Sequence, residues 1–79
     1  MNRAHLPLNF SIDSASTFDT LEAVLAIARR GNLRLMRLHV QASASDNLVS
    51  MELQADDPDL LDLFDARLRN VIGVHGIER

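Results

Sequence analysis

The chain has 79 residues, a formal charge of −3 and no cysteine. Its length fits one domain, expected to span residues 1–79. The lack of cysteine excludes a disulfide framework and a thiol nucleophile. A chain without disulfides fits the reducing cytoplasm. Net acidity without tyrosine or tryptophan argues against a nucleic-acid surface, and no apolar run approaches the ~20 residues of a membrane span. The hydrophobic fraction of 47% is high for this size, so we expect a homodimer that buries part of it.

The first predicted element is a strand. Apolar residues alternate with polar residues or proline, a period-two pattern that is typical of a strand with one buried face. The apolar members are Leu6, Leu8, Phe10 and Ile12. Pro7 cannot donate to a strand ladder, so we expect it near the start of the strand or facing an unpaired side.

An amphipathic helix follows the loop that starts at Asp13. Apolar residues recur at a spacing of three and four and predict one buried face: Phe18, Leu21, Val24, Leu25 and Ala28. Ser16 or Thr17 is expected to cap the first turn by accepting hydrogen bonds from its N–H groups. Gly31 is expected to end the helix in the left-handed conformation.

A hairpin is predicted next. A strand from about Leu33 to Ala42 would bury Met36, Leu38 and Val40. The segment 42–47 has turn residues, and the alternation that follows it predicts the third strand.

The last predicted elements are a second helix and a short strand. Asp57 before Pro58 predicts a capped helix start, and the helix should run to about Asn70. Asp65 and Arg69 are spaced to pair across one turn. Its apolar stripe is Leu60, Leu61, Phe64, Leu68 and Val71. Gly73 should then release the chain into a strand over residues 74–79.

The element order β-α-β-β-α-β predicts an α+β fold. One-sided strands need helices on a single face of the sheet, which describes a ferredoxin-like sandwich with a four-stranded antiparallel sheet. Right-handed crossovers would place the first and third strands in the centre and the second and fourth at the edges.

Few residues suggest chemistry. By strand parity His5, His39 and His75 lie on the open face of the sheet, where we interpret them as solvated side chains, since the spacing shows no metal-binding motif. Three acidic residues cluster at the start of the second helix, where capping already explains them: Asp56, Asp57 and Asp59. No nucleophile elbow, glycine-rich phosphate loop or zinc spacing is present in the sequence. We therefore expect no catalytic residue and no metal ligand.

The loop from Asp13 to Phe18 is the better candidate for a site. It precedes a helix N-terminus, where free N–H groups and the helix dipole favour a carboxylate or another anion. Ordinary helix capping is the alternative explanation, because every such helix must satisfy its first donors.

Several short segments carry a resemblance to a known family. They are Thr20-Leu21-Glu22 with Val24-Leu25, Ala28-Arg29-Arg30-Gly31-Asn32, Met36-Arg37-Leu38 and Leu68-Arg69-Asn70-Val71-Ile72-Gly73-Val74. Together with the element order they resemble the ACT domain, and more narrowly the small regulatory subunit of acetolactate synthase, also called acetohydroxyacid synthase, of the isozyme II type. The resemblance covers nearly the whole chain.

This resemblance implies an allosteric, non-catalytic subunit of branched-chain amino acid biosynthesis. It would bind and activate a large catalytic subunit that uses thiamine diphosphate, magnesium and FAD, and would itself carry no cofactor. Many ACT domains bind a small amino acid effector at the loop between the first strand and the first helix, across a dimer, with a proline-glycine pair shaping the loop. The candidate effector-binding residues here are Asp13, Ser14, Ser16, Thr17, Phe18 and Asn32. Because this loop lacks glycine, we expect valine or isoleucine to bind weakly or not at all.

Three functional hypotheses remain open. The first is the regulatory subunit of acetolactate synthase. The second is a stand-alone ACT-type homodimer that binds a small amino acid, and the third is a dimerisation domain without a ligand.

Overall fold

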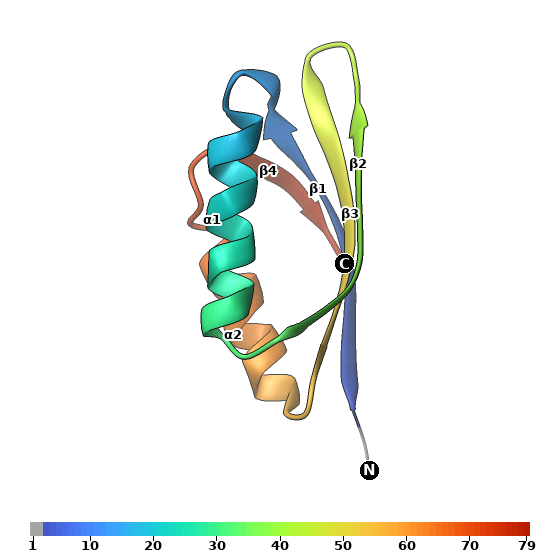
Figure 1. Ribbon diagram of the computed structural model, residues 1–79, viewed down its shortest axis with the longest axis vertical. Helices are drawn as coiled ribbons and strands as arrows, with labels where there is room; N and C mark the ends of the chain where they lie inside the picture. Colours follow the sequence, from blue (N-terminus) through green and yellow to red (C-terminus); the bar gives the residue numbers. More distant parts are fainter. Residues whose placement is uncertain (1–2) are drawn as a thin grey trace.

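The computed structural model describes residues 3–79, so Met1 and Asn2 of the predicted domain lie outside the described residues. The elements in chain order are β1 (Ala4–Asp13), a 3-10 turn η1 (Ser14–Ser16), α1 (Thr17–Arg30), β2 (Arg34–Ala42), β3 (Asp46–Ala55), α2 (Pro58–Leu68) and β4 (Val74–Glu78). Both helices lie on the same side of the sheet (Figure 1). Within the described part of the chain, no helix is both long and apolar enough to cross a membrane.

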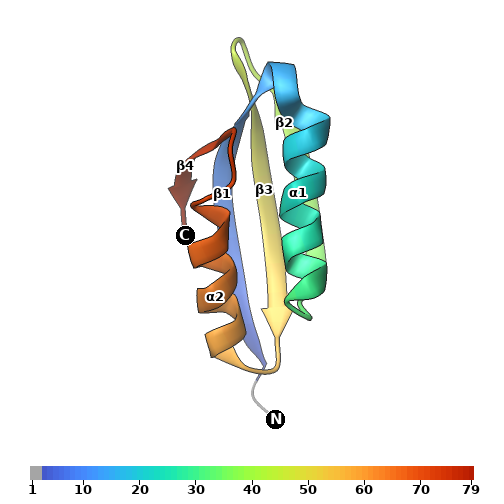
Figure 2. The ribbon, with the colours of Figure 1, turned by 90° about the vertical axis from the view of Figure 1, so that its left-hand side faces the viewer.

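The sheet has the predicted topology. Its strand order is β2-β3-β1-β4, with β1 and β3 in the centre. All neighbouring strands are antiparallel, and the β1–β3 register runs from Ala4 opposite Ala55 to Asp13 opposite Asp46. Figure 2 shows α1 and α2 side by side across one face of the sheet, with β4 at an edge. The predicted ferredoxin-like α+β sandwich is confirmed.

The core lies between the central strands and the two helices. The period-two pattern of β1 is confirmed, since its four apolar side chains are at most 2% exposed. They pack with alternate residues of β3 and with residues of both helices; the larger members of this cluster are Leu6, Leu8, Phe10, Ile12, Val24, Val49, Met51, Leu53, Leu61, Phe64 and Leu68. Burial of these apolar side chains is the main stabilising term for so small a domain.

The buried face of α1 differs from the prediction. Thr20, Val24 and Ala28 are buried, whereas Phe18 is 84% exposed. Successive helical residues are turned by about 100°, so Phe18 points about 200° away from Thr20, toward solvent. The expectation that Phe18 belongs to the buried stripe was wrong. The residue buried near the start of α1 is Thr20, because the connection between α2 and β4 covers it at Ile72 and Gly73.

Both ends of α1 also differ from expectation. Ser16, the N-cap, makes no side-chain capping bond, and the Thr17 hydroxyl donates to the carbonyls of Asp13 and Ser14 instead. At the other end Gly31 has φ −80°, and Asn32, with φ 62°, takes the left-handed conformation. The Leu33 N–H then donates to Ala28 O at 3.0 Å and the Asn32 N–H to Arg29 O at 3.1 Å. This is a Schellman ending one residue later than predicted.

Helix α2 begins as predicted. The Asp57 carboxylate accepts from the Asp59 N–H at 2.9 Å, with Pro58 at the first helical position. Arg69 Nε lies 3.4 Å from Asp65 Oδ2, as the spacing indicated. The helix ends at Leu68 rather than near Asn70, and a turn connects it to β4.

Strand β2 is the least buried element of the sheet. Only Leu38 is half-buried, and the other eight of its nine residues are exposed. A bulge between Leu35 and Arg37 breaks the expected alternation, and Met36 is 54% exposed. The prediction of a buried face at Met36 and Val40 was wrong, because β2 has a strand neighbour on one side only and little cover from the helices.

Candidate functional site

The turn between β1 and α1 lies at the same end of the molecule as the β2–β3 turn (Figure 1). Strand β1 ends at Asp13, the chain makes one 3-10 turn, and α1 begins at Thr17. Asn47, near the start of β3, donates from its side-chain amide to the Thr17 hydroxyl. A hydrogen bond between residues thirty positions apart thus ties the start of α1 to the sheet.

The segment that leads into β4 contacts the start of α1 through Ile72 and Gly73. Thr20 is 4% exposed, and its hydroxyl lies 3.4 Å from both Ser16 Oγ and the Ile72 carbonyl oxygen. Gly73, with φ +95°, follows directly, and a Cβ added there would lie 2.7 Å from Thr20 Oγ1. Only glycine allows this close approach without strain.

A shallow hollow of about 530 Å³ lies against the β1–α1 turn. Its lining is formed by Ser14, Ala15, Ser16, Thr17, Phe18, Asp19 and Asn47. The hydroxyls and amide of this lining offer hydrogen-bond donors and acceptors, and Phe18 offers an exposed aromatic ring. Such a surface can accept a small polar molecule with an apolar part.

The predicted effector-binding residues separate into two groups. Ser14, Ser16, Thr17 and Phe18 line the hollow, and Asp13 is the strand residue just before it. Asn32 lies beyond the opposite end of α1, which at 1.5 Å per residue is about 20 Å away, so it does not join the others.

Asp19 and Asn47 line the hollow but were missed by sequence reasoning. Asp19 was hidden by its ordinary place in the first turn of a helix. Asn47 could have been found from the predicted topology, because the start of the third strand must lie beside the end of the first, and the register places Asn47 opposite Ile12.

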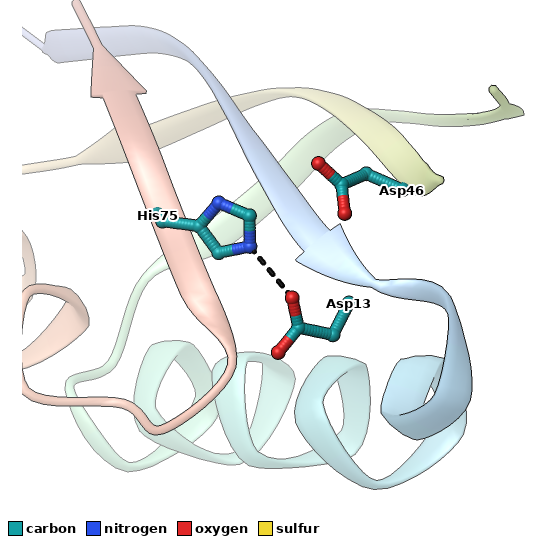
Figure 3. Close-up of side chains that lie close together, drawn as sticks. All are labelled: Asp13, Asp46 and His75. Carbon is teal, nitrogen blue, oxygen red and sulfur yellow. Dashed lines mark hydrogen bonds and ion pairs between the residues drawn. The ribbon is translucent and has the colours of Figure 1, made fainter. Parts of the chain in front are cut away.

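Two of the three histidines have carboxylate neighbours that the sequence did not reveal. His75 Nε2 lies 2.9 Å from Asp13 Oδ1, with Asp46 close by on the same side of the sheet (Figure 3). At the other end of β1, His5 Nδ1 lies 3.3 Å from Glu52 Oε2. His39 is exposed on β2, opposite Ser50.

Solved structures share this architecture. The crystal structure of the ACT domain from the GTP pyrophosphokinase of Chlorobium tepidum matches with a TM-score of 0.79 over 99% of each chain, at 13% identity. This chain has the ACT-domain fold. The C-terminal domain of the MgtC protein from Mycobacterium tuberculosis matches with a TM-score of 0.72 at 12% identity, over 94% of this chain and 82% of that one. The de novo designed protein Foldit4 matches with a TM-score of 0.79 at 9% identity, over 98% and 92%. No protein-family model and no curated protein sequence matches the chain.

On this ACT fold the β1–α1 turn closes without glycine or proline. Positive φ angles within residues 3–79 occur at Asn32, Gly73 and Gly76, and none of these lies in the turn. Every residue of the turn therefore carries a Cβ, which limits how closely a ligand can approach its N–H groups.

Proposed function

We propose that this chain is a non-catalytic regulatory module of the ACT type, and specifically the small subunit that binds and activates an acetolactate synthase. The ACT-domain fold and the resemblance carried by short segments along nearly the whole sequence support this proposal. The catalytic partner would hold thiamine diphosphate, magnesium and FAD, and this chain would supply none of the reacting groups.

The observation that carries the proposal is the exposed edge formed by β2. Leu35, Met36 and Val40 are 45%, 54% and 38% exposed, and the outer side of the strand has no neighbour in the sheet. Unpaired backbone N–H and C=O groups next to exposed apolar side chains form a template for another chain. This edge supports the proposal that the module associates, either with a second copy of itself or with a larger partner.

Activation by such a module requires only a modest preference for one state of the partner. If the module binds the active arrangement ~1.4 kcal/mol more tightly than the inactive one, the ratio of active to inactive enzyme rises about tenfold. An interface of a few apolar side chains and strand hydrogen bonds is sufficient for a difference of this size.

Reconstitution tests the proposal. The matching catalytic subunit is assayed for acetolactate formation with and without saturating amounts of this chain, and the expected result is a clear rise in turnover. Equal turnover in both cases would show that the regulatory-subunit assignment is wrong.

A matched pair of variants tests the role of the β2 edge. Leu35 on β2 and Leu63 on α2 are each 45% exposed, so glutamate substitution disturbs similar amounts of apolar surface at two different places. Leu35→Glu should weaken association and activation, whereas Leu63→Glu should leave both near the wild-type level. Equal loss in both variants would point to general destabilisation instead.

A stand-alone homodimer that binds a small amino acid is the second candidate. The hollow against the β1–α1 turn favours it, because its hydroxyls and amide are suited to a polar ligand. A gene for a thiamine-dependent large subunit next to the gene for this chain would favour the first candidate over the second.

A further inference from the structure

Three potential metal ligands from three different strands meet at one end of the sheet. Asp13 ends β1, Asp46 begins β3 and His75 lies in β4, and one ligand atom of each lies within 4.8 Å of the other two (Figure 3). Asp13 is directly opposite Asp46 in the register, and His75 is opposite Ser11, so all three lie on the face of the sheet that the helices leave open. The fold, rather than a local motif, creates this cluster.

The cluster carries negative charge that the described residues do not balance. Like charges directly opposite each other in an antiparallel pair are destabilising, and Asp13 and Asp46 stand in this relation. Asp13 contacts His75, but within residues 3–79 no arginine lies within ion-pair distance of either aspartate. The arginines that form ion pairs do so elsewhere, in the pairs Arg34–Asp56, Arg69–Asp65, Arg79–Asp62 and Arg79–Asp65. A bound cation would turn this repulsion into attraction.

The distances fit a single ion. In a tetrahedral Zn²⁺ site, ligand atoms about 2.1 Å from the metal lie roughly 3.4 Å from one another. His75 Nε2 and Asp13 Oδ1 are 2.9 Å apart, and the three ligand atoms all lie within 4.8 Å of one another. Rotation of these side chains would have to bring every pair to the tetrahedral distance. On binding, Nε2 would give up its hydrogen bond to Asp13 and direct its lone pair to the metal.

We propose that Asp13, Asp46 and His75 form a binding site for a divalent transition-metal ion, with Zn²⁺ as the best fit. Imidazole with carboxylates suits a borderline ion such as Zn²⁺, whereas Mg²⁺ and Ca²⁺ prefer oxygen ligands alone. Water completes the coordination, since the Asp13 and His75 side chains are 58% and 46% exposed. The ion links β1, β3 and β4 beside the β1–α1 turn, and so fastens the short edge strand β4 to the sheet.

Calorimetric titration of the tag-free, chelator-treated chain with ZnCl₂ tests this proposal. The expected result is one Zn²⁺ per chain with micromolar affinity, far weaker binding of Mg²⁺, and a rise of several degrees in the melting temperature at saturating Zn²⁺. Absence of Zn²⁺ binding at this level overturns the proposal.

Two site variants and one control identify the ligands. His75→Ala and Asp46→Asn should each weaken Zn²⁺ binding at least tenfold and abolish the rise in melting temperature. His5→Ala removes the other histidine that contacts a carboxylate, His5 with Glu52, and should leave Zn²⁺ binding unchanged. Binding that survives in both site variants, or that is lost in His5→Ala, would place the metal elsewhere and refute the assignment.

The melting temperature of Asp46→Asn, measured with and without Zn²⁺, distinguishes loss of the metal site from general destabilisation. Without metal, removing one of two opposed carboxylates should raise the melting temperature above that of the wild type, while with saturating Zn²⁺ the order should reverse. A variant that melts lower than the wild type under both conditions would contradict the electrostatic part of the argument.

Discussion

Gly73 is the position where a single methyl group should be most damaging. It joins α2 to β4 with φ +95°, a backbone conformation that residues with a side chain rarely adopt. A Cβ there would lie 2.7 Å from Thr20 Oγ1 and 3.3 Å from Ser16 Oγ. Gly73→Ala therefore combines backbone strain with a steric overlap against a buried side chain.

The two contributions can be estimated separately. A left-handed conformation costs a residue with a Cβ about 1–2 kcal/mol, and overpacking a well-filled site costs about 1–3 kcal/mol more. We expect Gly73→Ala to lower the free energy of unfolding by about 2–5 kcal/mol. For a domain of this size that loss should lower the melting temperature by more than about 8 °C.

Gly76→Ala is the matched control. Gly76 has φ +65° at the bulge of β4, and an added Cβ would have only Ser11 Oγ nearby, at 3.9 Å. This variant carries the backbone strain without the overlap, so it should cost about 1–2 kcal/mol. The difference between the two glycine variants measures the contact with α1.

A double-mutant cycle in urea or thermal unfolding isolates the same contact. Thr20→Ala removes the hydroxyl that the new methyl group meets, so it should recover roughly 1 kcal/mol or more when combined with Gly73→Ala. Combined with Gly76→Ala it should be additive. Equal costs for both glycine variants, or no recovery in the Thr20→Ala background, would refute the close approach between the β4 connection and α1.

Three further predictions concern association, ligand binding and the end of α1. The chain should be a homodimer through the exposed edge of β2, and a monomeric mass by light scattering at tens of micromolar protein would count against this. Valine and isoleucine should show weak or no binding in calorimetry, because the β1–α1 turn lacks glycine, and micromolar valine affinity would contradict that reasoning. Asn32→Gly should stabilise the chain by up to about 1 kcal/mol in urea unfolding, since Asn32 has φ 62°. Gly31→Ala should not stabilise it, because Gly31 has φ −80° and an added Cβ would lie 3.2 Å from the Ile27 carbonyl oxygen. The opposite order would mean that Gly31 holds the left-handed conformation.

Local patterns in the sequence determined much of the fold. The alternation in β1 and the Asp57-Pro58 start of α2 depend on neighbours within a few residues, so they could be predicted and are confirmed. The strand order followed as well, because short connections and right-handed crossovers leave few ways to arrange this order of elements. The turn before α1 could also be proposed as a candidate site from local patterns, because it lies between a predicted strand and a predicted helix.

Features that depend on how the elements pack were decided only by the tertiary structure. The buried side of α1 depends on the segment between α2 and β4, which covers Thr20 at Ile72 and Gly73 and leaves Phe18 exposed. The bulge in β2 changes which residues face the helices, and no local signal marks it. His75 and Asp13 are 62 residues apart, and they meet because the edge strand β4 pairs with the central strand β1 in one particular register. Shifting β4 by a single residue would send the imidazole to the other face of the sheet.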